Sequence, residues 1–229
     1  HSMKDVPTAL PIGIVQAAVL ERANTLDILV HKGNLDFLNG EGTIATGSLR
    51  RQAQWLNKYP NHKVVDLRGN VNTRMQKLQD SNWSGAVFAA AGLERINLKP
   101  SNYINLDWII PAPAQGAMVI VAMANDDFCR DAVAELNDIE TEVCTHIERQ
   151  FLKTLEGGCT APIGALAIIQ EDEIVFSGVL FSLDGKEKIE VNKTVPLEEW
   201  KKLGFIAAKE ILDNGGVSLM ERIRKDLKK

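Results

Sequence analysis

Residues 43–52 read Thr-Ile-Ala-Thr-Gly-Ser-Leu-Arg-Arg-Gln, in which a short apolar strand turns directly into a helix. Ser48 is a typical N-cap residue for that helix, which is expected over 49–58. The same order recurs twice, with strands and helices expected at 64–67 and 71–79, and at 85–89 and 91–95. Strands that alternate with helices predict an α/β fold with a parallel, doubly wound sheet.

The segments on either side of these units complete the expected organisation. A strand is expected at 14–20, a polar connection at 21–42, and a buried strand at 116–124 that returns the chain to the earlier sheet. Helices follow at 127–136 and at 140–156, where Gly157 and Gly158 give a C-terminal stop signal. The remainder predicts a C-terminal α+β unit with a three-stranded antiparallel sheet, its strands at 165–169, 174–182 and 188–195 and its helices at 200–212 and 218–227.

Composition narrows the class of protein. The net charge of −4 over 229 residues and an aromatic content of 6% argue against nucleic-acid binding. An odd number of cysteines, three, fits free thiols in a reducing compartment, and the longest apolar stretch, 117–124, is too short to span a bilayer. Four scattered histidines predict no metal centre.

Five arginines are expected where the strands of the three units turn into helices. The carboxyl ends of parallel strands share one edge of a sheet, where helix N-termini also favour anions. Guanidinium groups bind carboxylates or phosphates in pairs of hydrogen bonds. No phosphate-binding glycine motif is present, so the sequence favours a polycarboxylate small molecule over a nucleotide. The arginines are Arg50, Arg51, Arg68, Arg74 and Arg95.

Two further residues carry candidate chemistry. Cys159 lies in a Gly-Gly-Cys-Thr-Ala-Pro loop, where a free thiol is available for covalent chemistry, although a cysteine there can also be incidental. Asp5, two residues before Pro7, is the candidate acid or base, and turn formation is its simpler explanation.

Taken together, these segments resemble the porphobilinogen deaminase (hydroxymethylbilane synthase) family. The matching motifs occur in the family's order along nearly the whole chain. They are His-Ser-Met-Lys-Asp-Val-Pro at 1–7, Ser-Leu-Arg-Arg-Gln at 48–52, Leu-Arg-Gly-Asn-Val-Asn-Thr-Arg at 67–74, Ala-Ala-Gly-Leu-Glu-Arg at 90–95, Gln-Gly-Ala at 115–117, and residues 155–164.

The resemblance implies a transferase that condenses four porphobilinogen units head to tail into the linear tetrapyrrole hydroxymethylbilane, releasing ammonia. It implies a dipyrromethane cofactor attached through Cys159 and a catalytic carboxylate at Asp5. Its implied cofactor-binding residues are Cys159, Lys4, Ser48, Arg50, Arg51, Arg68 and Arg74, and its implied substrate-binding residues are Arg68, Arg74 and Arg95. A cytoplasmic monomer is expected, with no nucleic acid or membrane as partner.

The resemblance also implies periplasmic-binding-protein-like lobes and three domains. Residues 1–22 and 115–137 are expected to form the remainder of domain 1, 23–114 domain 2, and 138–229 domain 3. The family's first domain begins upstream of the His-Ser-Met-Lys-Asp motif, so the first lobe is expected to be incomplete and the activity of this shortened chain is left open. Gly47 and Ala114 depart from a serine and a glycine that are usual in the family.

Two alternatives remain from the residues alone. A non-catalytic polycarboxylate-binding module would explain the arginines, but it would explain neither the Gly-Gly-Cys loop nor the Asp5 motif. An RNA-binding protein would require an affinity that falls steeply with salt, and the charge and aromatic content disfavour it.

Overall fold

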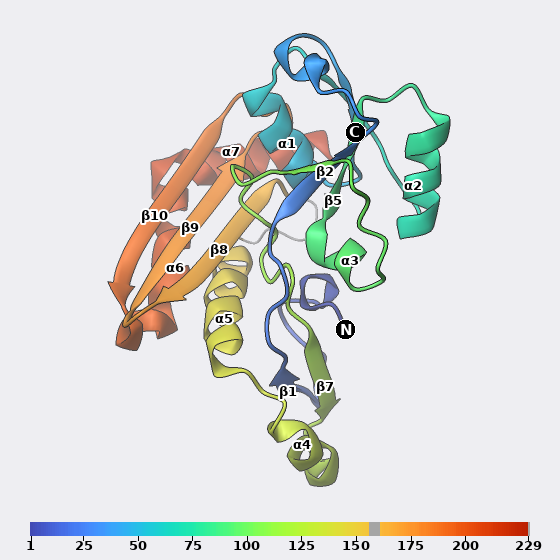
Figure 1. The fold of residues 1–229 in the computed structure, drawn as a ribbon. Coiled ribbons are helices and arrows are strands. Elements are labelled where there is room, and N and C mark those ends of the chain that lie inside the picture. Colours follow the sequence, from blue (N-terminus) through green and yellow to red (C-terminus); the bar gives the residue numbers. More distant parts are fainter. Residues whose placement is uncertain (156–160, 229) are drawn as a thin grey trace.

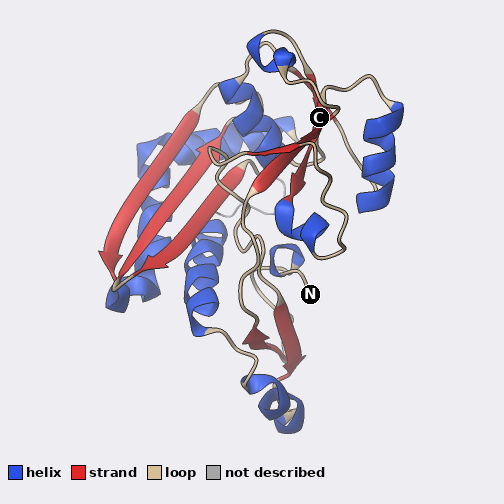
Figure 2. Ribbon diagram, viewed as in Figure 1, coloured by secondary structure: helices blue, strands red, loops and turns tan. Residues whose placement is uncertain are grey.

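In the computed structural model, residues 1–155 and 161–228 are described, and their strands form three sheets (Figures 1 and 2). The largest sheet has the strand order β4-β3-β5-β2-β6. Three of its strands are parallel, as expected, and each is followed by its helix. These elements are β3 (Thr43–Ala45), α1 (Leu49–Lys58), β4 (Lys63–Val65), α2 (Val71–Asp80), β5 (Gly85–Ala89) and α3 (Ala90–Glu94).

The expectation of a polar connection over 21–42 is wrong. Strand β2 (Asp27–His31) lies inside the large sheet, antiparallel to both β5 and β6 (Tyr103–Asn105), so the sheet is mixed rather than parallel throughout. Its three apolar residues, 28–30, are too short a run to stand out from their polar neighbours. Nonetheless they are buried on both faces, because helices and loops cover the sheet on each side.

A second, two-stranded sheet pairs β1 (Ile14–Val19) with β7 (Val119–Met123). The expectation that 116–124 is a buried strand of the earlier sheet is therefore wrong, because β7 pairs with β1 apart from the large sheet and most of its residues are only half-buried. The short 3-10 turn η1 (Met3–Asp5) packs beside it, with the Met3 side chain buried against Val19, Ala117 and Val119. Helix α4 (Asp127–Ala134) follows β7.

The C-terminal unit confirms the expected three-stranded antiparallel sheet, in the order β10-β9-β8. One face of this sheet is covered by three helices that share a single apolar core, in which Phe151 meets Phe176 edge to face. The elements are α5 (Ile139–Thr154), β8 (Ile163–Gln170), β9 (Glu173–Phe181), β10 (Lys188–Pro196), η3 (Leu197–Glu199), α6 (Trp200–Ile211), η4 (Leu212–Gly216) and α7 (Val217–Asp226).

The opposite face of β9 packs against the large-sheet unit. Val179 and Phe181 contact Ala53 on α1, and Asn57 Nδ2 donates to Gly185 O at 2.8 Å. Helix α1 therefore lies between two sheets, which fixes the position of its N-terminal arginines. Among the described residues, no helix combines the length and apolar character needed to cross a membrane.

Candidate active site

A cleft of about 240 Å³ opens where η1, the start of α1, α2 and the α5–β8 region come together. It collects side chains that are far apart in the sequence, four of them cationic and one, Asp5, a carboxylate. The residues that line it are Lys4, Asp5, Gly47, Ser48, Arg50, Arg51, Arg74, Ala112, Pro113, Gln115, Leu152, Ala161 and Ile163.

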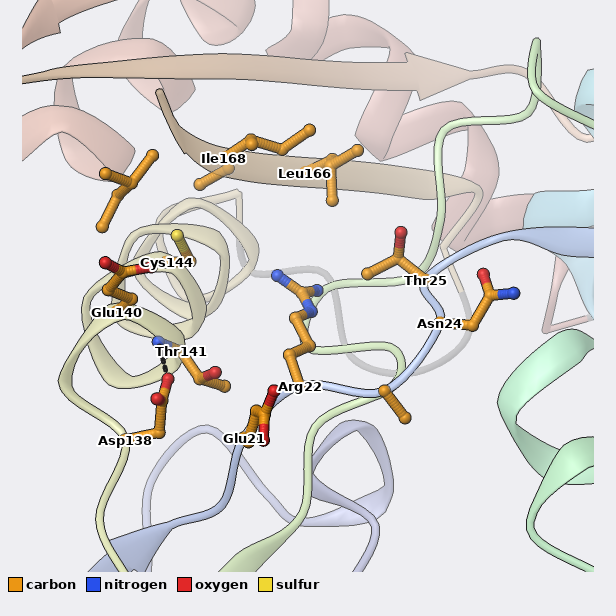
Figure 3. Close-up of a pocket in the computed structure, with 13 residues that line it drawn as sticks. Glu21, Arg22, Asn24, Thr25, Asp138, Glu140, Thr141, Cys144, Leu166 and Ile168 are labelled. Carbon is orange, nitrogen blue, oxygen red and sulfur yellow. Dashed lines mark hydrogen bonds between the residues drawn. The ribbon is translucent and has the colours of Figure 1, made fainter. Parts of the chain in front are cut away.

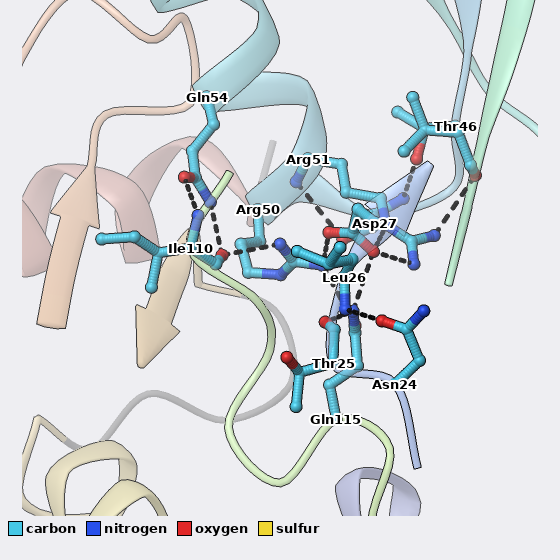
Figure 4. Close-up of polar contacts among 12 residues, drawn as sticks. Asn24, Thr25, Leu26, Asp27, Thr46, Arg50, Arg51, Gln54, Ile110 and Gln115 are labelled. Atoms are coloured by element: carbon cyan, nitrogen blue, oxygen red, sulfur yellow. Dashed lines mark hydrogen bonds and ion pairs between the residues drawn. The ribbon is translucent and has the colours of Figure 1, made fainter. Parts of the chain in front are cut away.

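Helix α1 begins at Leu49, so Arg50 and Arg51 lie in its first turn, beside the cleft. The Ser48 hydroxyl accepts a hydrogen bond from Arg51 N at 3.4 Å, which caps the helix as expected. Both guanidinium groups are then buried against strand β2. Arg50 Nη2 lies 2.7 Å from Asp27 Oδ2, and Arg51 donates from Nε and Nη2 to Asp27 Oδ1 at 3.0 and 2.7 Å (Figure 4).

Asp27 is fully buried and is the counter-ion of both arginines. Burial alone would raise the pKa of its carboxyl group, but the charges of Arg50 and Arg51 lower that pKa to about 2. Gln115 Nε2 donates to the same Oδ1 at 2.9 Å. The carboxylate therefore holds both guanidinium groups in fixed positions at the base of the cleft.

The cationic groups are crowded beyond what Asp27 can neutralise. Desolvation lowers the pKa of Lys4, and the nearby charge of Arg51 lowers it further, although the residue as a whole keeps an exposed surface. Arg74, whose Nε donates to Gly69 O at 2.7 Å, has its pKa lowered by desolvation and then by Arg51. An anionic ligand would relieve this repulsion.

The cleft also contains an unsatisfied donor. Arg50 Nη1 donates to Ile110 O at 2.8 Å, but Arg50 Nε is buried and has no hydrogen-bond partner among the described residues. Asp27 Oδ2 is close enough to Arg50 Nη2 for an ion pair, but among the described residues it accepts no hydrogen bond of good geometry. The four cationic residues that line the cleft fit a ligand that brings several carboxylates.

Not every expected site residue lies in this cleft. Arg68 is exposed, and its Nε donates to Asp66 at 3.0 Å. Arg95 is exposed at the C-terminal end of α3, so the expectation that it lies where a strand turns into a helix is wrong. Cys159 lies outside the described residues, although Leu152 and Ala161, on either side of it in the sequence, line the cleft.

Sequence reasoning missed Asp27, because the segment that contains it was expected to be a polar connection. The only available signal was a carboxylate directly before the apolar run Ile28–Val30. It also gave no role to Gln115, which bridges Thr25 O and Asp27 through Nε2 at 2.7 and 2.9 Å.

A second cavity, of about 490 Å³, lies between residues 21–25, helix α5 and strand β8 (Figure 3). Cys144, which lines this cavity, is buried. Desolvation, and then the negative charge of Glu148, raises the pKa of the Cys144 thiol to about 11, so this thiol is a poor nucleophile. Cys129 is exposed on α4, away from the residues that line the cleft. No group of metal-ligating side chains occurs in the described ranges 1–155 and 161–228.

The fold and the site together define an α/β protein with a cationic cleft suited to a ligand that has several carboxylates. The sequence profile of the porphobilinogen deaminase, dipyromethane cofactor binding domain matches residues 1–131, and that of the C-terminal domain matches 142–213. The chain is 36% identical to the porphobilinogen deaminase of a Geobacillus species (strain WCH70) and 37% identical to that of Chloroherpeton thalassium. In both comparisons, 99% of this chain and 74% of the relative are covered.

The chain belongs to the porphobilinogen deaminase family of transferases, which condense porphobilinogen in tetrapyrrole biosynthesis and use a dipyrromethane cofactor. The alternative of a non-catalytic polycarboxylate-binding module has no support. Among solved structures, an amino acid ABC transporter substrate-binding protein of Streptococcus pneumoniae overlaps with 52% of this chain and 52% of its own, at 13% identity and a TM-score of 0.32. An overlap of that quality carries no argument about fold or function.

Proposed function

We propose that the cleft between η1, α1 and α5 is the place where this chain joins porphobilinogen units head to tail. The observation that supports this best is the gathering of Lys4, Asp5, Ser48, Arg50, Arg51 and Arg74 around one cavity. These residues come from two distant motifs of the family and from a third on α2. The cationic side chains can bind the carboxylates of the substrate, and the Asp5 carboxylate can then act on the bound substrate.

The cofactor is proposed to be attached to Cys159 and to be held through its acetate and propionate groups. Lys4, Ser48, Arg50, Arg51, Arg68 and Arg74 are the proposed ligands of those groups. When bound, the dipyrromethane supplies the primer to which the first substrate unit is joined. The positions of Arg50 and Arg51 support this assignment, because both line the cleft and are held there by the Asp27 carboxylate.

Asp5 is proposed to be the catalytic residue. Porphobilinogen carries its aminomethyl nitrogen in the protonated form. As the C–N bond breaks, nitrogen takes the bonding electron pair and leaves as ammonia, and the positive charge passes to the pyrrole. A carboxylate that accepts a hydrogen bond from the pyrrole N–H stabilises that charge. Asp5 is exposed on the cleft side of η1, where it can reach such a group.

Arg68, Arg74 and Arg95 are proposed to bind the carboxylates of the incoming substrate. Of these three, Arg74 lines the cleft, whereas Arg68 and Arg95 are exposed outside its lining. Arg68 and Arg95 would therefore have to reach the substrate from outside the cleft. The domain boundaries 1–22 with 115–137, 23–114 and 138–229 also remain proposals, as do a cytoplasmic location and a monomeric state.

The experiment that tests the catalytic role is Asp5→Asn. Removing the negative charge while keeping the shape should lower porphobilinogen turnover by about a hundredfold or more and leave the cofactor attached. Turnover is measured as ammonia and hydroxymethylbilane formed, and attachment as intact mass. Asp172→Asn, in the β8–β9 turn away from the cleft, is the matched control and should keep turnover. Near-normal turnover in Asp5→Asn would refute the role of Asp5.

A further inference from the structure

The turn η1, which contains Lys4 and Asp5, is held on its N-terminal side by backbone pairing. Met3 N donates to Ala117 O at 3.0 Å, and Val119 N donates to His1 O at 2.9 Å. These bonds attach residues 1–3 to the segment that leads into β7. They do not extend past Met3, so the rest of the turn depends on other contacts.

One side chain holds the other side of the turn, and it comes from a distant helix. Arg149, on α5, donates from Nη1 to Met3 O and to Val6 O, each at 3.0 Å, and from Nη2 to Pro7 O at 2.6 Å. Its guanidinium group thus binds backbone carbonyls on both sides of Asp5. Within the described part of the chain, the side-chain hydrogen bonds to the backbone of residues 3–7 all come from Arg149.

The guanidinium group of Arg149 binds the backbone carbonyls of the turn and no carboxylate among the described residues. None of the ion pairs among the described residues includes it, and burial lowers its pKa without removing the charge of a guanidinium group. The neighbouring Glu148 is fully buried, with hydrogen bonds to both termini of the Arg22 fork and to two backbone amides, so this part of α5 is firmly placed. One turn further along the helix, Leu152 lines the cleft.

We infer that Arg149 is a positioning residue, which sets the place of the Asp5 carboxylate in the cleft by binding the carbonyls of residues 3, 6 and 7. The inference rests on the catalytic role proposed for Asp5. Without Arg149 the turn keeps two local bonds, Asp5 N to Ser2 O and Val6 N to Met3 O, at 3.1 and 3.2 Å. A 3-10 turn of three residues is weak by itself, and a displacement of about 1 Å at a catalytic group can cost about a hundredfold in rate.

The first test uses Arg149→Met, which keeps the aliphatic stem and removes every donor, and Arg149→Lys, which keeps the charge but cannot reach three carbonyls with a planar fork. Arg149→Met should lower kcat for porphobilinogen by about 10- to 100-fold and change KM by less than about threefold, with the Cys159 adduct retained. Arg149→Lys should be intermediate. Arg222→Met, which breaks an exposed pair with Glu187, is the control and should keep kcat.

The second test does not depend on activity. Backbone amide hydrogen exchange of Asp5 and Val6 should accelerate by at least about tenfold in both Arg149 variants, because their amides are bonded only within the turn. The amides of Met3 and Val119, bonded to the neighbouring strand segment, should exchange as before. Unchanged exchange at Asp5 and Val6 in a folded Arg149→Lys protein would overturn the inference.

The third test separates positioning from general destabilisation. If Arg149 acts through Asp5, adding Arg149→Met to Asp5→Asn should cause no further loss of turnover, whereas independent effects would multiply. A multiplied loss would overturn the inference and leave the role of Asp5 intact. Near-normal turnover in Asp5→Asn alone would instead refute the proposed function, even if the amide exchange of the turn changed as expected.

Discussion

Asp27 shows how one buried side chain can prepare a cationic site. Two guanidinium groups next to each other repel, yet Arg50 and Arg51 both remain buried because the Asp27 carboxylate lies between them. Within the described ranges, the arrangement leaves Arg50 Nε without a hydrogen-bond partner. The carboxylate thus places the arginines without using all of their hydrogen-bonding capacity, which is what a site for a second anion requires.

The pH dependence of stability should report this carboxylate. The pKa of Asp27 is lowered from 3.8 to about 2 in the folded chain, so its contribution is complete above the unfolded pKa and is lost as the pH falls from about 4 toward 2. In urea unfolding, the stability advantage of the parent over Asp27→Asn should therefore shrink by about 2 kcal/mol across this range. A difference that does not change with pH would contradict the ion pairing.

The sequence predicted the arginines of the site but neither their counter-ion, Asp27, nor the side chain that binds the Asp5 turn, Arg149. Ser48, Arg50 and Arg51 could be placed because a helix start is a local signal. Asp27 and Arg149 could not, because each acts through contacts with residues that are distant in the sequence. Which long-range segments meet is decided by packing, which a short motif does not contain.

The turn between β3 and α1 depends on the small size of Gly47. A Cβ atom added there would lie 2.6 Å from Leu67 O, closer than real contacts allow, because the end of β3 runs directly beside the segment that follows β4. The serine that is usual in the family at this position would therefore require the backbone to shift in this chain.

Gly47→Ser should lower the free energy of unfolding by about 1–3 kcal/mol, the usual cost of overpacking. Gly92→Ala is the matched control, since a Cβ there meets nothing within 4 Å and alanine favours the helix. Urea denaturation of both variants measures the effect. A Gly47→Ser protein as stable as its parent would show that the loop at Leu67 moves freely.

The elements themselves divide into those with local signals and those without. Helix α1 and the three parallel strands were predicted because a cap, an apolar run and a helical pattern follow one another there. Strand β2 was missed because three apolar residues suffice for a strand that is covered on both faces and paired on both edges. Its burial comes from its neighbours and leaves no periodic pattern.

Across the whole molecule, Glu148 links three segments. Its two oxygens accept from Arg22 Nη1 and Nη2 at 2.7 and 2.9 Å, from Ala114 N at 2.6 Å and from Ala167 N at 2.8 Å. Arg22 lies in the segment that connects β1 to β2, and Ala114 lies in the segment that connects β6 to β7. Ala167 lies on β8. The carboxylate therefore fixes the C-terminal unit against both connections.

Glu148→Gln should lower the free energy of unfolding by about 3–5 kcal/mol, because it removes the fully buried carboxylate that neutralises the half-buried Arg22 guanidinium. Glu187→Gln removes a similar two-pronged contact with Arg222 on the surface and should cost no more than about 1 kcal/mol. Urea unfolding compares the two variants directly. Equal losses would mean that the Arg22–Glu148 contact has no special role in joining the units.

The chemical state of Cys159 decides whether this chain builds a cofactor and elongates it at the proposed site. Purified protein is incubated with porphobilinogen, its intact mass is measured, and the peptide that contains residues 155–164 is mapped. We expect a mass excess of one dipyrromethane on the Cys159 peptide, also in Asp5→Asn, with further pyrrole units added only when Asp5 is present. An unmodified Cys159, or an adduct on Cys129 or Cys144, would refute the proposed attachment of the cofactor.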